Sequence, residues 1–165
     1  MSRRAKESVS KTNAMRILET AGVDFECVTY EVDENDLSGV HVASVLGQDP
    51  EQVFKTLVLV GASREHHVCC IPVAEELDLK KAARAAGEKN VEMLPLRDLT
   101  DVTGYIRGGC SPLGMKKQFP TIFDETAILF DRIAFSAGKR GMQIVANAEE
   151  VAAVIGAQFA DLTRS

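Results

Sequence analysis

Two consecutive apolar segments separated by a short polar turn constrain the fold of this chain most strongly. Residues 54–60 (FKTLVLV) predict a strand, and residues 67–73 predict a second strand after the turn at residues 61–65 (GASRE). Neighbouring strands joined by so short a connection pair antiparallel as a hairpin, whereas parallel strands need a long crossover. The hairpin therefore excludes a regular repeat of strand, helix and parallel strand.

The remaining segments predict helices and short strands around this hairpin. Helices are expected between Thr12 and Gly22, between Asp78 and Gly87, and between Asn147 and Gly156, because each segment begins with a capping residue and ends at a glycine. Shorter helices are expected at residues 42–47 and 95–104, and strands at residues 23–32, 121–123, 128–130, 133–135 and 142–145. We expect an α/β fold with a mixed, largely antiparallel sheet, curled toward a barrel and surrounded by helices.

The length of the chain and its apolar content favour one globular domain. A chain of 165 residues with 45% hydrophobic residues supports a single full core, and it contains no linker or repeat. Residues 1–11 are expected to form a flexible tail, and residues 12–165 the domain. No apolar run approaches the length of a membrane span, and the basic N-terminus lacks the features of a secretory signal. The expected location is the cytoplasm, with no membrane partner.

The cysteines and histidines do not have the spacing of a metal site. Cys69 and Cys70 are adjacent on a predicted strand and should point to opposite faces, while Cys27 and Cys110 lie far away in sequence. We expect reduced, mostly buried cysteines, and neither a metal nor another cofactor. The pair at residues 66–67 (HH) is expected to be exposed and inert at the tip of the hairpin.

The charge distribution favours weak contact with an anionic partner. The net charge of −5 argues against tight, non-specific nucleic-acid binding, but residues 102–123 and 132–148 contain basic residues and no acidic ones. Lys80 and Lys81 are most simply placed on a solvated helix face. A net-acidic protein with a local basic patch suits a transient interaction with a polyanion.

Two glycine-containing segments are candidates for a binding site. The first covers residues 108–114 (GGCSPLG) and is followed by Lys116 and Lys117; the second covers residues 138–141 (GKRG). Paired glycines let backbone N–H groups approach a ligand closely, and flanking cations attract an anion. The alternative is two surface turns with lysines that serve solubility. A nucleophilic Cys110 is a further alternative, although the sequence supplies no evident histidine partner.

Lys55 and Tyr30 are individual side chains with two interpretations each. Lys55 shares a strand face with Leu57 and Leu59, so its ammonium is either desolvated against a ligand or extends to water at the strand end. Tyr30 is either part of the core or part of a pocket. The sequence also lacks a Gly-x-Ser-x-Gly elbow, a Walker loop, a His-Glu-x-x-His helix and a dinucleotide fingerprint. For an enzyme, the nucleophile would therefore come from water or from the substrate.

These segments together resemble the YbaK/EbsC-type aminoacyl-tRNA deacylases, which are related to the editing domain inserted in bacterial prolyl-tRNA synthetases. The resemblance extends from about Asn13 to Asp161. It rests on residues 29–31 (TYE), 53–57 (VFKTL), 77–81 (LDLKK), 103–105 (TGY), 108–117 (GGCSPLGMKK) and 138–141 (GKRG), in that order.

The resemblance implies a single-domain enzyme that acts in trans on a mischarged tRNA. The subgroup that it resembles most removes cysteine from tRNA(Pro), and in that subgroup the thiol of the substrate attacks its own ester. The alternatives are an Ala-tRNA(Pro)-type deacylase that uses water, and a non-catalytic module that binds the tRNA end or a synthetase. The expected partners are the 3′ end of an aminoacyl-tRNA and, transiently, prolyl-tRNA synthetase.

The resemblance also assigns roles to residues. By likeness, Lys55 contacts the terminal adenosine or the ester, Tyr30 lines the pocket, and the Gly108 and Gly109 amides hold the carbonyl oxygen. The residues expected to shape the loop or to lie near the terminal nucleotide are Ser111, Pro112, Gly114, Gly138 and Lys139. One departure is Gln143, where some relatives have an aspartate, so a role that needs a carboxylate there does not transfer.

Overall fold

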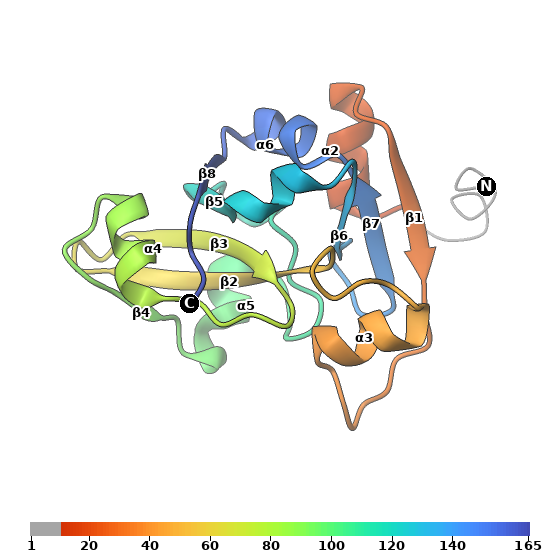
Figure 1. The fold of residues 1–165 in the computed structure, drawn as a ribbon, viewed down its shortest axis with the longest axis horizontal. Coiled ribbons are helices and arrows are strands. Elements are labelled where there is room, and N and C mark those ends of the chain that lie inside the picture. The colour runs from red at the N-terminus through yellow and green to blue at the C-terminus, as the bar shows by residue number, and fades with distance from the viewer. Residues whose placement is uncertain (1–10) are drawn as a thin grey trace.

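The computed structural model describes residues 11–165, so the predicted tail lies outside the described residues apart from its last position. The elements follow one another along the chain as Figure 1 shows. They are α2 (Asn13–Ala21), β1 (Phe25–Thr29), α3 (Gly39–Leu46), β2 (Phe54–Gly61), β3 (His66–Pro72), α4 (Leu79–Ala86), β4 (Val91–Met93), η1 (Leu96–Asp98), α5 (Leu99–Thr103), β5 (Thr121–Asp124), η2 (Glu125–Leu129), β6 (Ile133–Ser136), β7 (Met142–Ala146), α6 (Ala148–Ile155) and β8 (Gln158–Ala160).

The strands form two sheets. Strands β1, β7 and β6 make an antiparallel sheet, and β4, β2, β3, β5 and β8 make a mixed sheet in that order, with parallel pairing at β3–β5 and β5–β8. A parallel bridge between Val53 and Ala134 joins them, and Ala134 N–H donates to the Gln52 carbonyl at 3.0 Å. The predicted hairpin is confirmed, as is the mixed, largely antiparallel α/β fold. The described strands close no barrel, so the expected curl toward one is not confirmed.

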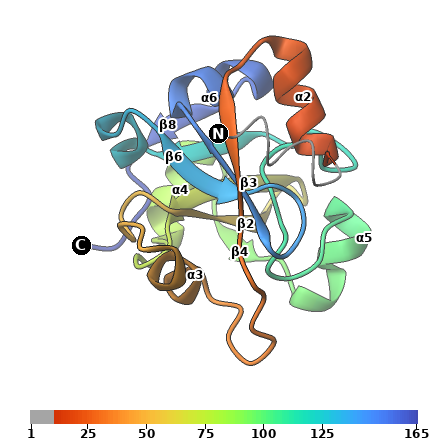
Figure 2. The same cartoon turned by 90° about the vertical axis from the view of Figure 1, so that its right-hand side faces the viewer.

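The two faces of β2 contribute to different apolar cores. Phe54 and Val58 pack in the main core, which includes Met15 and Leu18 of α2 and residues of α6. Leu59 faces the other way and packs in a smaller core under α4. Figure 2 shows α2 and α6 beside each other above the sheets. The sheet that carries the hairpin is thus covered on both faces, and ligand access is left to its edges and loops.

The predicted boundaries of the three capped helices, α2, α4 and α6, are confirmed because they depend on local hydrogen bonds. The helix expected at residues 42–47 begins earlier, at Gly39, and the segment expected as one helix at residues 95–104 divides into η1 and α5. The Thr12 hydroxyl accepts from Met15 N–H at 3.2 Å, and the Asn147 side chain accepts from Glu150 N–H at 3.0 Å. The first and last of these helices both end at a glycine in the left-handed conformation, as α4 also does. Across residues 11–165, no helix has both the length and the apolar character that crossing a membrane requires.

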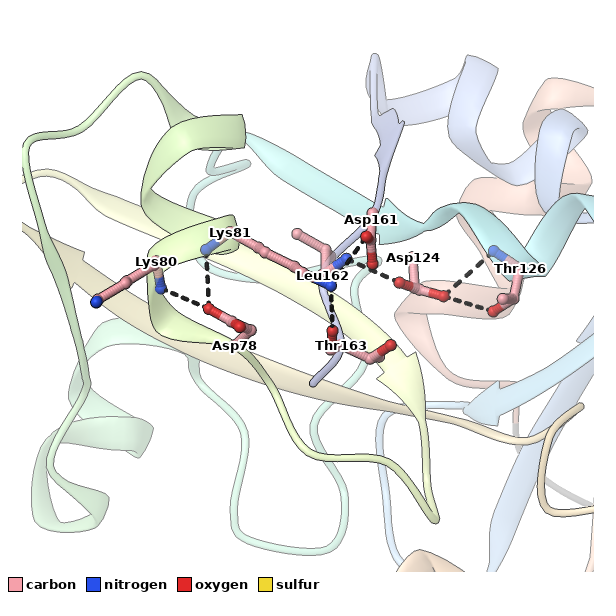
Figure 3. A network of polar contacts seen from close by, with 8 residues as sticks. All are labelled: Asp78, Lys80, Lys81, Asp124, Thr126, Asp161, Leu162 and Thr163. Carbon is pink, nitrogen blue, oxygen red and sulfur yellow. Dashed lines mark hydrogen bonds and ion pairs between the residues drawn. The ribbon is translucent and has the colours of Figure 1, made fainter. Parts of the chain in front are cut away.

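Several strand predictions require correction. The strand expected at residues 128–130 is wrong: Asp124 accepts from Thr126 N–H (3.2 Å) and from its hydroxyl (2.5 Å), and this cap starts the 3₁₀ turn η2. The same carboxylate accepts from Leu162 N–H at 2.9 Å, as Figure 3 shows, and so holds the C-terminal segment. Strand β1 ends at Thr29 and not at residue 32. Strands β4 and β8 are not among the predicted strands.

The cysteines behave as the sequence predicts. All four are free thiols; three are buried, and Cys110 is half-buried. Cys70 packs in the main core and Cys69 in the core under α4, so the adjacent thiols do lie on opposite faces of β3.

Candidate functional site

The two glycine segments come together in the folded chain. A β-carbon placed on Gly109 would lie 3.1 Å from Lys139 Cα and 3.2 Å from Arg140 N. These contacts are with backbone atoms, which cannot move aside as a flexible side chain would. Gly109 therefore allows a close approach of the two loops that any side chain would obstruct.

Tyr105 fixes the other end of the glycine loop. A β-carbon on Gly114 would lie 2.7 Å from the Tyr105 hydroxyl, and one on Gly138 would lie 3.1 Å from Tyr105 Cε1. The hydroxyl donates to the Leu113 carbonyl at 2.5 Å, and burial raises its pKa to about 12. Tyr105 is thus a neutral hydrogen-bond donor wedged between the two segments. The residues predicted as the site omit Tyr105, although it belongs to the TGY motif.

Arg140 joins three segments beside a small cavity. Its Nε donates to the Arg107 carbonyl at 2.8 Å, and its Nη1 lies 3.3 Å from a carboxylate oxygen of Glu34. Tyr30, Gly108 and Arg140 line this cavity together with residues of the 31–45 segment. Its volume is about 10 Å³, room for about one water molecule. Residues 31–45 therefore cover Tyr30 in this conformation.

A larger cavity of about 270 Å³ shares Gly108 with the small one. Its walls are mostly apolar, with Arg107 as the charged group. It is lined by Thr56, Leu57, Val58, Met93, Leu94, Leu96, Leu99, Arg107, Gly108 and Cys110. A cavity of mostly apolar walls with a few polar groups is the usual form of a small-ligand site. Gly108 stands at the boundary between the two cavities.

The main chain of Thr56 faces this larger cavity. Val73 N–H donates to the Val53 carbonyl, just before β2 begins, and bonding to β3 recurs at every second residue. The backbone N–H and C=O groups of the odd-numbered residues of β2 therefore point toward β3. Val58 bonds on the other side, where its carbonyl accepts from Leu94 N–H at 2.9 Å. Thr56 is two residues before Val58, so its N–H and C=O also point to the β4 side of β2. Strand β4 does not extend as far as Thr56, so no strand covers these two groups. The cavity wall thus offers a backbone donor and a backbone acceptor.

Lys55 lies on the predicted strand face, opposite Ile71 in the register with β3. Its side chain is half-buried, and this desolvation lowers its pKa while the carboxylates of Glu76 and Glu75 raise it. Lys55 does not line the cavity of Tyr30 and Gly108. It shares a face with Leu57, which lines the larger cavity. Lys55 itself lines neither this cavity nor the one that contains Tyr30.

The backbone amides of the glycine pair are not equivalent. Gly109 N–H donates to the Ile106 carbonyl at 3.0 Å. No hydrogen bond to another described residue uses the Gly108 N–H. Gly108 has a φ of 84°, a conformation that side-chain-bearing residues seldom adopt. Of the two predicted oxyanion donors, Gly108 is the one whose N–H is available here.

The centre of the glycine loop is buried and internally bonded. Ser111 is fully buried, and its hydroxyl accepts from Leu113 N–H at 3.3 Å. Pro112 is buried beside it. Both residues shape the loop and do not line either cavity.

Cys110 does line the larger cavity, but burial raises the pKa of its thiol to about 12. A thiol with that pKa is not a nucleophile at neutral pH.

The side chain of Gln143 forms hydrogen bonds with the side chain of another glutamine, Gln48. It is buried, and its side-chain amide exchanges hydrogen bonds of 2.8 and 3.2 Å with Gln48. This pairing satisfies the polar atoms of a buried amide without any charge. Gln143 therefore links β7 to the end of α3.

The prediction of an exposed, inert histidine pair is wrong for His67. Only 5% of His67 is exposed, and its Nε2 lies 2.7 Å from a carboxylate oxygen of Glu88. His66 is half-buried, with its ring against Phe119 at a centroid distance of 5.2 Å. The acidic partner comes from the connection after α4, 21 residues away, so nothing near the histidines in sequence indicates it.

The fold and the site define a single-domain α/β protein whose candidate site is built from two glycine loops and the edge of a mixed sheet. The sequence model of the aminoacyl-tRNA editing domain matches residues 37–156. EbsC of Enterococcus faecalis, proposed by its name to be a Cys-tRNA(Pro)/Cys-tRNA(Cys) deacylase, is 49% identical over 158 residues, or 96% of each chain. The chain therefore belongs to the aminoacyl-tRNA editing domain family.

Solved structures agree with this assignment. One described as a proposed trans-editing enzyme for prolyl-tRNA synthetase is 25% identical, with a TM-score of 0.79, and covers 94% of this chain and 100% of its own. The structure of the hypothetical protein APE2540 is 17% identical, with a TM-score of 0.84, and covers 93% of this chain and 100% of its own. This second likeness concerns the fold only.

Proposed function

We propose that the protein is a trans-editing deacylase that removes cysteine mischarged on tRNA(Pro). The observation that carries this proposal is the near full-length relationship to a chain named for that activity, combined with the glycine-loop site. A tRNA substrate implies activity in the cytoplasm. Prolyl-tRNA synthetase is the proposed transient partner, because a chain of net charge −5 gains little selectivity for a tRNA body by itself.

The aminoacyl end of the tRNA is proposed to bind in the cavity between Thr56 and Gly108. The Gly108 N–H donates to the ester carbonyl oxygen, whose negative charge grows in the transition state. Gly109 keeps Lys139 and its neighbours close, and its own amide holds the Ile106 carbonyl. Losing one such oxyanion donor typically slows an enzyme about 100- to 1000-fold.

The other predicted site residues support this arrangement. Lys55, which is half-buried and shares a strand face with Leu57 of the cavity wall, is proposed to contact the ester or the terminal adenosine. Tyr30 faces Gly108 from across the small cavity. The buried residues of the loop hold Gly108 in position, and the second glycine segment lies against the first near the terminal nucleotide. These supporting residues are Ser111, Pro112, Gly114, Gly138 and Lys139.

The proposed chemistry uses the thiol of the substrate. The cysteine sulfur attacks the carbonyl carbon of its own ester, a C–S bond forms, and the C–O bond to the tRNA breaks. The thiol proton is transferred to the departing ribose oxygen, giving a thiolactone and free tRNA. A thiol tethered to its carbonyl starts with a high effective concentration, so positioning and oxyanion stabilisation supply the catalysis. The raised pKa of Cys110 agrees with the absence of a protein nucleophile.

Deacylation of matched substrates tests this proposal. The purified protein is incubated with Cys-tRNA(Pro), Ala-tRNA(Pro), Ser-tRNA(Pro) and Pro-tRNA(Pro), with Lys55→Ala as the control enzyme. We expect rapid loss of cysteine only, and a large decrease in the Lys55→Ala variant. Equal rates on the cysteine and alanine esters would instead indicate a water-using, Ala-tRNA(Pro)-type deacylase. No hydrolysis by folded protein would indicate a module that binds the tRNA end or the synthetase without catalysis.

A further inference from the structure

A third cavity is lined by residues of α4, of the connection that follows it and of the start of β4. Its volume is about 310 Å³, and three cationic side chains belong to its lining: Lys80, Arg84 and Lys89. The remaining lining residues are Leu79, Ala83, Glu88, Asn90 and Val91. Figure 1 shows α4 and β4 at one end of the molecule, away from α2 and β1. The proposed function uses none of these cations.

The basic residues of α4 fall into two kinds. Lys81 Nζ donates to Asp161 Oδ2 at 2.9 Å and to the Thr163 carbonyl at 2.7 Å, and so fastens the C-terminal segment. Figure 3 shows the Lys80 side chain extending away from this network. Lys80 and Arg84 are four residues apart and share a helix face. Within residues 11–165, neither they nor Lys89 form an ion pair. These three cations are free to meet a ligand.

The acidic member of the lining does not neutralise the three cations. Glu88 accepts hydrogen bonds from Ser63 N–H (3.1 Å) and the Ser63 hydroxyl (2.5 Å), and it lies 2.7 Å from His67 Nε2. These bonds lower the pKa of Glu88, and its side chain is only 7% exposed. Its carboxylate is therefore turned inward to the hairpin. The nearby Glu92 alternates with Val91 along β4 and so projects from the other face of the strand.

Strand β4 connects this cavity with the candidate site. Val91 lines the cationic cavity and Met93 lines the cavity that contains Gly108. Both residues lie on the same face of the strand, and their Cα atoms are separated by about 7 Å at the usual rise per residue. The walls of the two cavities therefore contain neighbouring residues of one strand face.

We propose that the α4–β4 cavity binds backbone phosphates of the acceptor arm of the tRNA whose aminoacyl end occupies the candidate site. This inference rests on the proposed function. RNA is the favoured occupant because the cations are unpaired, they lie next to the site of the RNA 3′ end, and the rest of the chain is net acidic. Arg84 suits phosphate well, since a guanidinium binds two of its oxygens at once.

Binding of uncharged tRNA(Pro) tests the inference without using catalysis. We compare the full-length protein with the triple variant Lys80→Gln, Arg84→Gln, Lys89→Gln by fluorescence anisotropy over a series of salt concentrations. We expect the Kd to rise at least 10-fold, and the slope of log Kd against log salt to fall by about 2 to 3, roughly one for each phosphate that the variant no longer neutralises. An unchanged Kd and an unchanged slope would overturn the inference.

The control variant removes the same charge at the opposite end of the molecule. Lys11→Gln, Arg16→Gln, Arg132→Gln alters two exposed residues and the half-buried Arg132, near α2 and β6. The ion pairs that it removes have exposed or half-buried partners and contribute little stability. We expect this variant to keep the salt slope and to bind within about threefold of the wild type. An equal loss in both triple variants would show that only net charge matters and would overturn the assignment of a site.

Substrate length provides the second readout. For Cys-tRNA(Pro), the α4–β4 variant should raise KM at least 10-fold with kcat unchanged. For the cysteinyl ester of adenosine, which carries no phosphate, it should change neither constant. Equal losses on both substrates would contradict the inference.

An inactive protein whose tRNA binding still depends on the three cations would refute the deacylase proposal and support the RNA site. Loss of synthetase binding with unchanged tRNA binding would assign the surface to a protein and refute the RNA site.

Discussion

The hydroxyl of Tyr105 donates a 2.5 Å hydrogen bond to the carbonyl oxygen of Leu113, inside the loop that carries Gly108. Leu113 is fully buried, so its carbonyl has no water to replace this donor. Gly114 and Gly138 both lie against the same tyrosine ring. One side chain thus fixes the distance between the two glycine segments.

Replacing Tyr105 by phenylalanine should destabilise the protein by about 1 to 3 kcal/mol, because it leaves the buried Leu113 carbonyl without a donor. For a chain of this size we expect the Tm to fall by roughly 2 to 10 °C. Thermal and urea unfolding measure the change. Tyr30→Phe is the matched control, since the Tyr30 hydroxyl makes no hydrogen bond to a described residue. Equal stability of the two variants would contradict this role of Tyr105.

Substituting Gly109 by alanine should separate the two glycine loops, because the new β-carbon would meet the Lys139 and Arg140 backbone at 3.1 to 3.2 Å. A displacement of this kind near reacting groups can cost about 100-fold in rate, so we expect that loss in kcat/KM for Cys-tRNA(Pro). Gly22→Ala is the control: its β-carbon meets nothing within 4 Å, and its strain of roughly 1 kcal/mol affects only stability. Full activity of Gly109→Ala would show that the close approach is dispensable.

The pH dependence of deacylation should report the charge of Lys55. Burial lowers its pKa below the ordinary value of 10.5, so a reaction that needs the ammonium should lose rate, as pH rises, earlier than an ordinary lysine would allow. Glu76 raises this pKa, so Glu76→Gln should move the alkaline decline to lower pH. The pH of this alkaline decline is measured from initial rates corrected for spontaneous ester hydrolysis. Glu149→Gln, on α6, should leave the profile unchanged, and the same result for Glu76→Gln would exclude Lys55 as the titrating group.

Substituting Cys110 by alanine should leave the rate on Cys-tRNA(Pro) within about twofold of the wild type. Burial raises the pKa of this thiol to about 12, so it is protonated at neutral pH and cannot act as a nucleophile. Single-turnover deacylation measures the rate directly. A loss of 100-fold or more, in a variant with normal thermal stability, would restore the thiol-enzyme hypothesis.

Features that depend on neighbouring residues were predictable from the sequence. The caps at Thr12, Asp78 and Asn147 bond to backbone amides two to three residues away, so the pattern of residue types is sufficient to locate them. The hairpin at residues 54–73 follows from one short turn. The strand expected at residues 128–130 is wrong because Asp124 caps a 3₁₀ turn through Thr126. The bond from the distant Leu162 to the same carboxylate has no local pattern that shows it.

Pairings between distant segments depended on the tertiary structure. Gln143 stands where some relatives have an aspartate. Its hydrogen-bond partner, Gln48, is 95 residues away in sequence, so only the fold shows the pair. His67 became buried because Glu88 reaches it from another element. Nothing in the sequence shows that Tyr30 lines the small cavity beside Gly108 whereas Lys55 lines neither of the two cavities that share Gly108.

The sequence by itself determined the boundaries of the three capped helices, the antiparallel hairpin and the glycine loops as candidate site, because short-range hydrogen bonds and backbone freedom are properties of adjacent residues. The tertiary structure decided that Gly109 packs against Lys139, that the Gly108 amide is the available donor, and that Lys80, Arg84 and Lys89 surround one cavity. These outcomes depend on which segments meet in space, and the packing of the whole core sets which distant segments meet.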